Sequence, residues 1–224
     1  FIIVHNEKMK EHLLRYGCHS QLYNLGIFDY LSHAVPRQYS TSHQPWSVVY
    51  AGGLGKWRNE FLYKLESYIH NWRLDIYGKG FEKNYADGWK HIVYHGFLGS
   101  EEFVDQIEAD FGLVWDGHSI QECSGDWGEY LKINNPHKTS FYLRSGLPVI
   151  VWSQAAMASF VHEHEVGICV DSLADVNNVL AGLTGEQYQV MKENAIKIGR
   201  LLGEGYFIKQ ALNEAINSFV TNGK

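Results

Sequence analysis

Short apolar runs alternate with amphipathic stretches along most of the chain. The apolar runs have the length and near-continuous hydrophobicity of strands buried on both faces, and they lie at 1–5, 21–25, 46–51, 73–77, 91–95, 111–115, 148–152 and 167–170. The amphipathic stretches, whose apolar residues recur at helical spacing, lie at 7–15, 59–70, 100–107, 136–144, 155–162, 173–182, 186–202 and 207–219. This alternation predicts an α/β fold with a doubly wound parallel sheet, in a domain over 46–205.

Two segments precede this domain, a short structured one and a linker. Residues 1–35 carry a strand–helix–strand pattern of their own, and the polar segment 36–45, with a proline at each end, is typical of a linker. The chain begins on an apolar strand without an initiator methionine. We therefore expect it to start inside a domain, with 1–35 as the remnant of that domain, and to be inactive without the missing part.

The last predicted part, 206–224, is a helix with one apolar face. Its residues Ile208, Leu212, Ile216 and Phe219 recur at helical spacing. Such a face needs a partner, and an exposed one promotes association. Seven Trp and 14 Tyr add candidates for contacts between copies, so we expect a homo-oligomer.

Composition excludes several classes of protein. The 224 residues include 19 Lys and Arg against 25 Asp and Glu, a net charge of −6 that rules out a chain-wide basic field for nucleic acid. No apolar run approaches the roughly 18 residues of a membrane span, and no signal region precedes the first strand. Three scattered cysteines do not form a disulfide framework. These features predict a cytoplasmic protein without a membrane span.

Ligands of such sheets bind beyond the carboxyl ends of the strands, and a glycine-rich loop follows the strand 46–51. Gly52 and Gly53 let a backbone approach an anion closely, and Lys56 and Arg58 add positive charge at the start of a helix. The spacing fits neither the dinucleotide fingerprint nor the P-loop. A glycine turn with two solvated cations explains the same residues.

A second candidate anion-binding site lies at the start of the predicted helix 136–144. Pro136 suits a helix start, because a backbone N–H at that position would have no partner within the helix and proline has none to lose. His137, Lys138 and Thr139 follow in the first turn. The helix dipole disfavours a cation at this end. The position of Lys138 therefore predicts that an anion such as a diphosphate binds between the helix and the ammonium. The alternative is that the side chain only extends to solvent.

Two further strand ends carry candidate contacts. Phe97, followed by Leu98, can stack on a base, although Phe97 suits a core position as well. Asp116 can accept hydrogen bonds from sugar hydroxyls, or it can stabilise a turn. The segment 162–165 has two His and two Glu without the spacing of a zinc motif, and the cysteines have none either. No metal ligand is predicted.

Four blocks in order carry a family resemblance: YAGGLGKW, HGFLGSEEF, FGLVWDG and NNPHKTSFYLRSGLPVIVW. The last resembles a block of GT-B glycosyltransferases. Together they resemble the second-step glucosyltransferases that glycosylate bacterial serine-rich-repeat adhesins, and the related β-1,6-galactofuranosyltransferases. The resemblance extends over about 1–219. It implies two Rossmann-like halves, of which this chain is the C-terminal, nucleotide-sugar-binding half plus a remnant of the N-terminal acceptor half, with the final helix crossing back to that half.

The resemblance also assigns residues. Lys138 matches the diphosphate-binding lysine, Lys56 the basic residue after the glycine loop with Arg58 as a possible substitute, and Phe97 the aromatic that contacts uracil. The chain departs from many GT-B members at Phe141, where they carry a ribose-binding glutamate. The expected catalytic residues are Lys138, Lys56 and Arg58. The expected donor-binding residues are Gly52, Gly53, Phe97, Leu98, Asp116, Pro136, His137 and Thr139.

The expected function is that of a retaining, metal-independent glycosyltransferase without a cofactor. Its donor would be a UDP-sugar, UDP-glucose by resemblance, and its acceptor a glycan such as N-acetylglucosamine on a serine-rich adhesin. Three alternatives stay open: a galactofuranosyltransferase for surface polysaccharide, a noncatalytic nucleotide-sugar-binding subunit, and a flavodoxin-like regulator. The last leaves Lys138 and the glycine loop unexplained.

Overall fold

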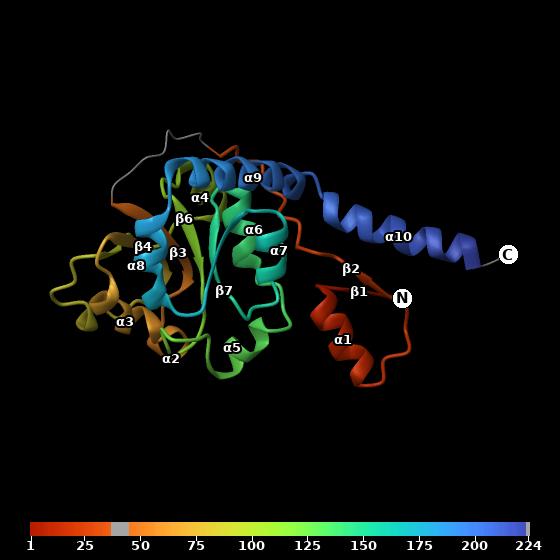
Figure 1. Ribbon diagram of the computed structural model, residues 1–224, viewed down its shortest axis with the longest axis horizontal. Helices are drawn as coiled ribbons and strands as arrows, with labels where there is room; N and C mark the ends of the chain where they lie inside the picture. Colours follow the sequence, from red (N-terminus) through yellow and green to blue (C-terminus); the bar gives the residue numbers. More distant parts are fainter. Residues whose placement is uncertain (37–44, 223–224) are drawn as a thin grey trace.

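A six-stranded parallel sheet forms the centre of the molecule (Figure 1). The computed structural model describes residues 1–36 and 45–222. The strand order is β5-β4-β3-β6-β7-β8, and every neighbouring pair is parallel. The strands are β3 (Trp46–Gly53), β4 (Trp72–Lys79), β5 (Ile92–Tyr94), β6 (Phe111–Val114), β7 (Val149–Trp152) and β8 (Gly167–Val170). The predicted α/β fold with a doubly wound parallel sheet is confirmed.

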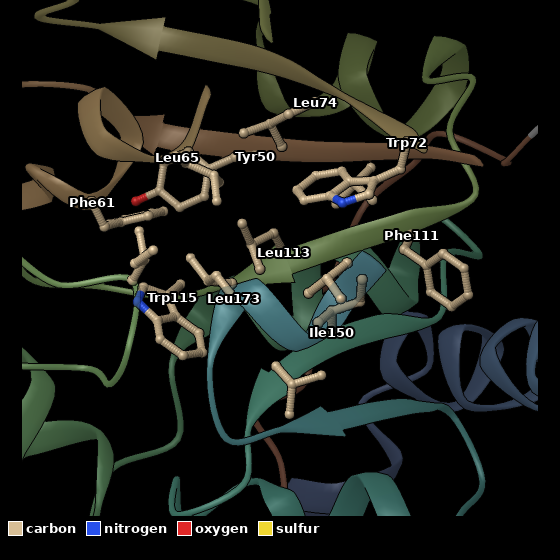
Figure 2. Packing of buried hydrophobic residues seen from close by; sticks show 14 of the residues in the cluster. Tyr50, Phe61, Leu65, Trp72, Leu74, Phe111, Leu113, Trp115, Ile150 and Leu173 are labelled. Atoms are coloured by element: carbon tan, nitrogen blue, oxygen red, sulfur yellow. The ribbon is translucent and has the colours of Figure 1, made fainter. Parts of the chain in front are cut away.

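Helices cover both faces of this sheet. They are α2 (Lys56–Asn59), α3 (Phe61–Leu65), α4 (Ser100–Gln106), α5 (Gly125–Leu131), α6 (His137–Arg144), α7 (Ala158–Glu163), α8 (Val176–Gly182) and α9 (Gly185–Gly203), with 3-10 turns at η1 (Glu66–Tyr68), η2 (Lys83–Tyr85) and η3 (Leu173–Asp175). Successive strand residues point to opposite faces, so Val48 and Tyr50 belong to one buried cluster and Val49 to another. The cluster with Tyr50 packs under α3 and α8, and Figure 2 shows part of it.

Two predicted helices are divided in the structure, and one observed helix was not predicted. The helix expected over 59–70 is divided into α2, α3 and η1, and the helix expected over 173–182 into η3 and α8. The unpredicted helix is α5, after the loop that follows β6. Gly125 and Gly128 lower the helix propensity of this segment. Packing requires the second of them, because a Cβ on Gly128 would lie 2.3 Å from the backbone carbon of Cys123.

The N-terminal segment forms a separate small sheet beside the large one (Figure 1). Strands β1 (Ile2–Val4) and β2 (Leu22–Asn24) pair in parallel, with α1 (Glu7–Arg15) between them in sequence. The last helix, α10 (Tyr206–Asn222), packs on β2, where the hydroxyls of Tyr23 and Ser218 are hydrogen-bonded. Most of the linker expected over 36–45 lies outside the described residues.

The apolar face of α10 has only a partial cover. Its small residues Ala211 and Ala215 are buried, whereas the four predicted stripe residues are exposed, from 37% for Ile208 to 54% for Ile216. At the start of the helix, the carboxylate of Asp29 accepts hydrogen bonds from the backbone N–H groups of Phe207 and Ile208 at 3.1 and 2.7 Å.

In the described part of the chain, every helix is too short or too polar to cross a membrane.

Candidate functional site

A pocket of about 520 Å³ opens at the carboxyl ends of β3 and β4, beside the start of α6. This is the edge of a parallel sheet at which ligands of α/β proteins bind. Its lining combines glycines, aromatic rings and cationic side chains. The lining residues are Tyr30, Ala51, Gly52, Gly53, Tyr77, Gly78, Lys79, Phe97, Leu98, Ser100, Phe103, His137, Lys138 and Phe141.

Lys138 lies in the first turn of α6, as predicted, and its ammonium points back toward β3. Pro136 occupies the position just before the helix. The ammonium donates hydrogen bonds to the Tyr50 hydroxyl at 2.6 Å and to Asp116 Oδ1 at 3.2 Å, and the side chain is only 18% exposed. Burial lowers the pKa of Lys138, and the negative charge of Asp116 opposes that shift.

Asp116 joins Lys138 to Arg58. The same carboxylate oxygen lies 3.4 Å from the Arg58 guanidinium, which stacks 3.9 Å from the ring centre of Trp127 on α5. Asp116 is buried and leaves these three charged groups with a net charge of +1. We expected Asp116 to accept sugar hydroxyls; in the structure its carboxylate is engaged with two cations.

The glycine loop packs closely against Lys138 and against the neighbouring strand β4. A Cβ on Gly52 would lie 3.1 Å from Cε of Lys138, so this glycine leaves room for the lysine. Gly78 is its partner across the β3–β4 pair. A Cβ on Gly78, where φ is +147°, would lie 1.8 Å from the Gly52 carbonyl oxygen. The exposed backbone of Gly53 also lines the pocket.

Aromatic side chains form the pocket walls. The Phe97 ring is 64% exposed, which rejects the core alternative for this residue, and the Lys79 ammonium lies 4.7 Å from its centre. Phe141 occupies the position at which the resemblance expects a ribose-binding glutamate in many members, and it packs 4.5 Å from Phe103 between ring centres. Leu98 lines the pocket beside them.

The other residues predicted in the first turn of α6 have different surroundings. His137 lines the pocket, with its ring stacked 4.4 Å from that of Phe28. Thr139 is fully buried outside the pocket lining, and its hydroxyl has no hydrogen-bond partner within the described residues. His137 is therefore placed to meet a ligand, whereas Thr139 faces the protein interior.

Lys56 lies apart from Lys138. Its ammonium is 3.9 Å from the ring centre of Tyr85, its backbone N–H donates to Glu82 at 3.1 Å, and it does not line the pocket. Of the three expected catalytic residues, the structure brings Lys138 and Arg58 together through Asp116, and Lys56 lies apart from this group. Lys138 lines the pocket, whereas Arg58 and Lys56 do not.

Several residues of this site were not predicted from the sequence, among them Tyr50, Tyr77 and Lys79. Lys79 could have been found, because it lies between two glycines at the end of a predicted strand. From its place in an apolar run, Tyr50 is expected to be an ordinary core residue. Its connection to the site is the hydrogen bond that its hydroxyl accepts from Lys138. Over residues 1–36 and 45–222, no group of three His, Cys, Asp or Glu side chains is arranged to hold a metal ion.

Comparisons with known proteins agree with this architecture. A profile of the family "Glucosyltransferase 3-like, C-terminal domain" matches residues 48–215. The β-1,6-galactofuranosyltransferase WbbI of Escherichia coli strain K12 is 31% identical over 220 residues, which are 98% of this chain and 64% of that protein. Glucosyltransferase 3 of Streptococcus gordonii is 35% identical over 127 residues, which are 56% of this chain and 37% of that protein.

The fold comparison gives the same architecture. The crystal structure of Anabaena HepE in complex with UDP-glucose superposes with a TM-score of 0.61 at 12% identity, covering 97% of this chain and 64% of that one. At this identity the likeness concerns the fold alone. The chain spans less than two thirds of the length of the curated relatives described above.

Proposed function

The chain belongs to the glucosyltransferase 3-like family, and we propose that it is the donor-binding part of a glycosyltransferase that uses a UDP-sugar. The observation that carries this proposal is the pocket at the start of α6. Its described lining contains Lys79, His137 and Lys138 but no Asp or Glu. A concave site with cations, aromatic walls and exposed glycine backbone suits a nucleoside diphosphate, which combines an anionic part with a flat base.

Within this proposal, each part of the pocket has a role. The diphosphate lies at the amino end of α6, where free backbone N–H groups and the helix dipole favour negative charge. Gly52 and Gly53 offer backbone at close range, and Phe97 stacks on the uracil. Phe141 has no hydrogen-bonding group, so the ribose hydroxyls are bound by other groups than a glutamate at this position.

Transfer breaks the bond between the anomeric carbon and the diphosphate. Negative charge then grows on the leaving UDP, and a cation fixed beside it stabilises the transition state more than the ground state. Lys138 is held in such a place by Tyr50 and Asp116, and Arg58 adds a second positive charge through Asp116. We propose that these side chains supply the charge stabilisation that a metal ion provides in other transferases, and that the reaction retains the anomeric configuration.

The donor sugar has two candidates. The resemblance to adhesin glucosyltransferases favours UDP-glucose, with a glycan acceptor such as N-acetylglucosamine on a serine-rich protein. The match to WbbI over 98% of this chain favours galactofuranosyl transfer to a surface polysaccharide instead. Competition between UDP-glucose and UDP-galactofuranose for binding to the chain distinguishes the two, because the donor with the lower Kd is the one the pocket accommodates.

A thermal-shift panel with UDP, GDP and NAD tests the proposed ligand class. A ligand that binds only the folded state stabilises it by about 2.7 kcal/mol at a hundredfold excess over Kd, so a selective rise in Tm with UDP is expected. The variant Lys138→Met should reduce that rise. Equal shifts with all three nucleotides, or no shift with UDP at saturating concentration, would contradict the proposal.

A further inference from the structure

Lys79 is a second cation that lines the pocket together with Lys138. It is the last residue of β4 and lies directly across from Gly53 in the β3–β4 register. Lys138 contacts the same loop at Gly52. The two lysines therefore lie beside the paired glycines on different elements, Lys79 at the end of a strand and Lys138 in the first turn of a helix.

The charge of Lys79 is not balanced by a carboxylate. Within residues 1–36 and 45–222, no ion pair or side-chain hydrogen bond engages its ammonium, and no acidic residue is found among the described lining of the pocket. The ammonium instead lies 4.7 Å from the centre of the Phe97 ring, a weak interaction at an exposed position. By contrast, Lys138 shares Asp116 with Arg58.

This difference matters for binding a diphosphate. The group of Lys138, Arg58 and Asp116 has a net charge of +1, because the carboxylate cancels one of its two cations. A nucleoside diphosphate carries more than one negative charge at neutral pH. An additional cation in the same pocket, not already neutralised, is therefore expected to contribute to its affinity.

Lys56, the alternative from the sequence, is less suited to this task. Its ammonium lies over the ring of Tyr85 at 3.9 Å, and neither residue lines the pocket. We propose that Lys79, rather than Lys56, is the second lysine that binds the diphosphate of the donor, leaving the face of Phe97 when the ligand enters. This inference rests on the proposed function, because it presumes a nucleoside diphosphate in the pocket.

The test compares Lys79→Met with wild type by titration calorimetry with UDP. The variant should bind UDP roughly tenfold more weakly, which corresponds to about 1.4 kcal/mol, and its affinity should fall less steeply with added salt. Binding of uridine, followed by ligand-observed NMR, should change by less than about twofold, since uridine lacks the diphosphate. Lys79 is exposed, and circular dichroism will verify that the variant is folded.

The matched control is Lys83→Met. Lys83 also lies over an aromatic ring, 5.9 Å from the centre of Tyr94, but does not line the pocket, so this variant should bind UDP as wild type does. Unchanged UDP affinity in Lys79→Met overturns the inference, and so does an equal loss for uridine, which would mean that Lys79 contacts the nucleoside. If wild type binds uridine and UDP equally or neither of them, the proposed function fails, and this inference with it.

Discussion

Replacing Lys138 by Met removes the charge at the centre of the proposed site and keeps most of the side chain. The aliphatic part still fills the space beside Gly52, where Cε lies 3.1 Å from the position of a Cβ. The lost groups are the ammonium and its hydrogen bonds to Tyr50 and Asp116. The variant therefore isolates the electrostatic contribution of Lys138 from its packing.

The expected effects differ in size between binding and turnover. A hydrogen bond to a charged group contributes about 1.5–3 kcal/mol, so UDP affinity should fall by roughly 10- to 100-fold. Turnover should fall further, by about 10²–10³ beyond any effect on binding, because removing one preorganised donor at a developing negative charge has that cost. The affinity is measured by calorimetry on this chain, and turnover by UDP release from UDP-sugar by the full-length enzyme.

Stability provides the internal check. Without the ammonium, the buried Tyr50 hydroxyl loses a partner, at a cost of about 1–3 kcal/mol, while the cost of burying the charge disappears. The net change in Tm should be small, since about 1 kcal/mol corresponds to ~2–4 °C for a chain of this size. Lys132→Met is the matched control, because that lysine pairs with Glu129 on α5 outside the pocket. A folded Lys138→Met variant with wild-type UDP affinity and turnover would refute the role assigned to Lys138.

Three further predictions follow from the same structure. Burial lowers the pKa of Lys138, so UDP affinity should fall as pH rises through that lowered pKa. The free energy of unfolding of the unliganded chain should rise in the same interval, because the unfolded state then binds the additional proton. Calorimetry and urea titration between pH 7 and 10 measure both, and the UDP affinity of Lys138→Arg should not change with pH in this interval, because a guanidinium stays charged. Gly78→Ala should destabilise the fold by more than about 1 kcal/mol and weaken UDP binding, since its Cβ would meet a backbone oxygen at 1.8 Å. The control Gly99→Ala, whose Cβ meets no atom within 4 Å, should bind UDP as wild type does and lose about 1 kcal/mol or less, because Gly99 is the N-cap of α4 and alanine caps helices less well than glycine; urea titration measures the stability of both variants. Burial raises the pKa of the Cys123 thiol to about 12, so a thiol reagent at pH 8 should label Cys123 only after denaturation. Cys169 is exposed and should be labelled in the native state, more slowly than a free thiol because partial burial raises its pKa as well. Rapid labelling of Cys123 in the native state would contradict its burial.

Local patterns in the sequence were enough to predict the architecture. Each strand of the large sheet was predicted within two residues at either end, because a strand buried on both faces needs a continuous apolar run whatever surrounds it. The boundaries of α1 and β8 were predicted without error. The helix α5 was not predicted, because it contains Gly128, which close contact with the backbone of Cys123 in the preceding loop requires.

The site was only partly accessible to this reasoning. Sequence alone placed Lys138 in the first turn of a helix at the ligand-binding edge, since the helix start and the alternation of strands with helices follow from short-range signals. It could not decide between Lys56 and Arg58, two residues apart on α2. Tertiary packing turns Arg58 toward Asp116 and Lys56 toward Tyr85, because the direction of a long side chain depends on partners that are remote in sequence.

Composition and periodicity thus predicted the strands of this chain and most of its helices, and the order in which they alternate. Only the tertiary structure decided that Asp116 neutralises part of the positive charge, that Tyr50 holds Lys138, and that no carboxylate of the described residues pairs with Lys79. The physical reason is the distance along the sequence over which each effect acts. Hydrophobic burial selects elements through neighbours a few residues apart, whereas charge balance in a pocket depends on groups that the fold brings together from four different segments.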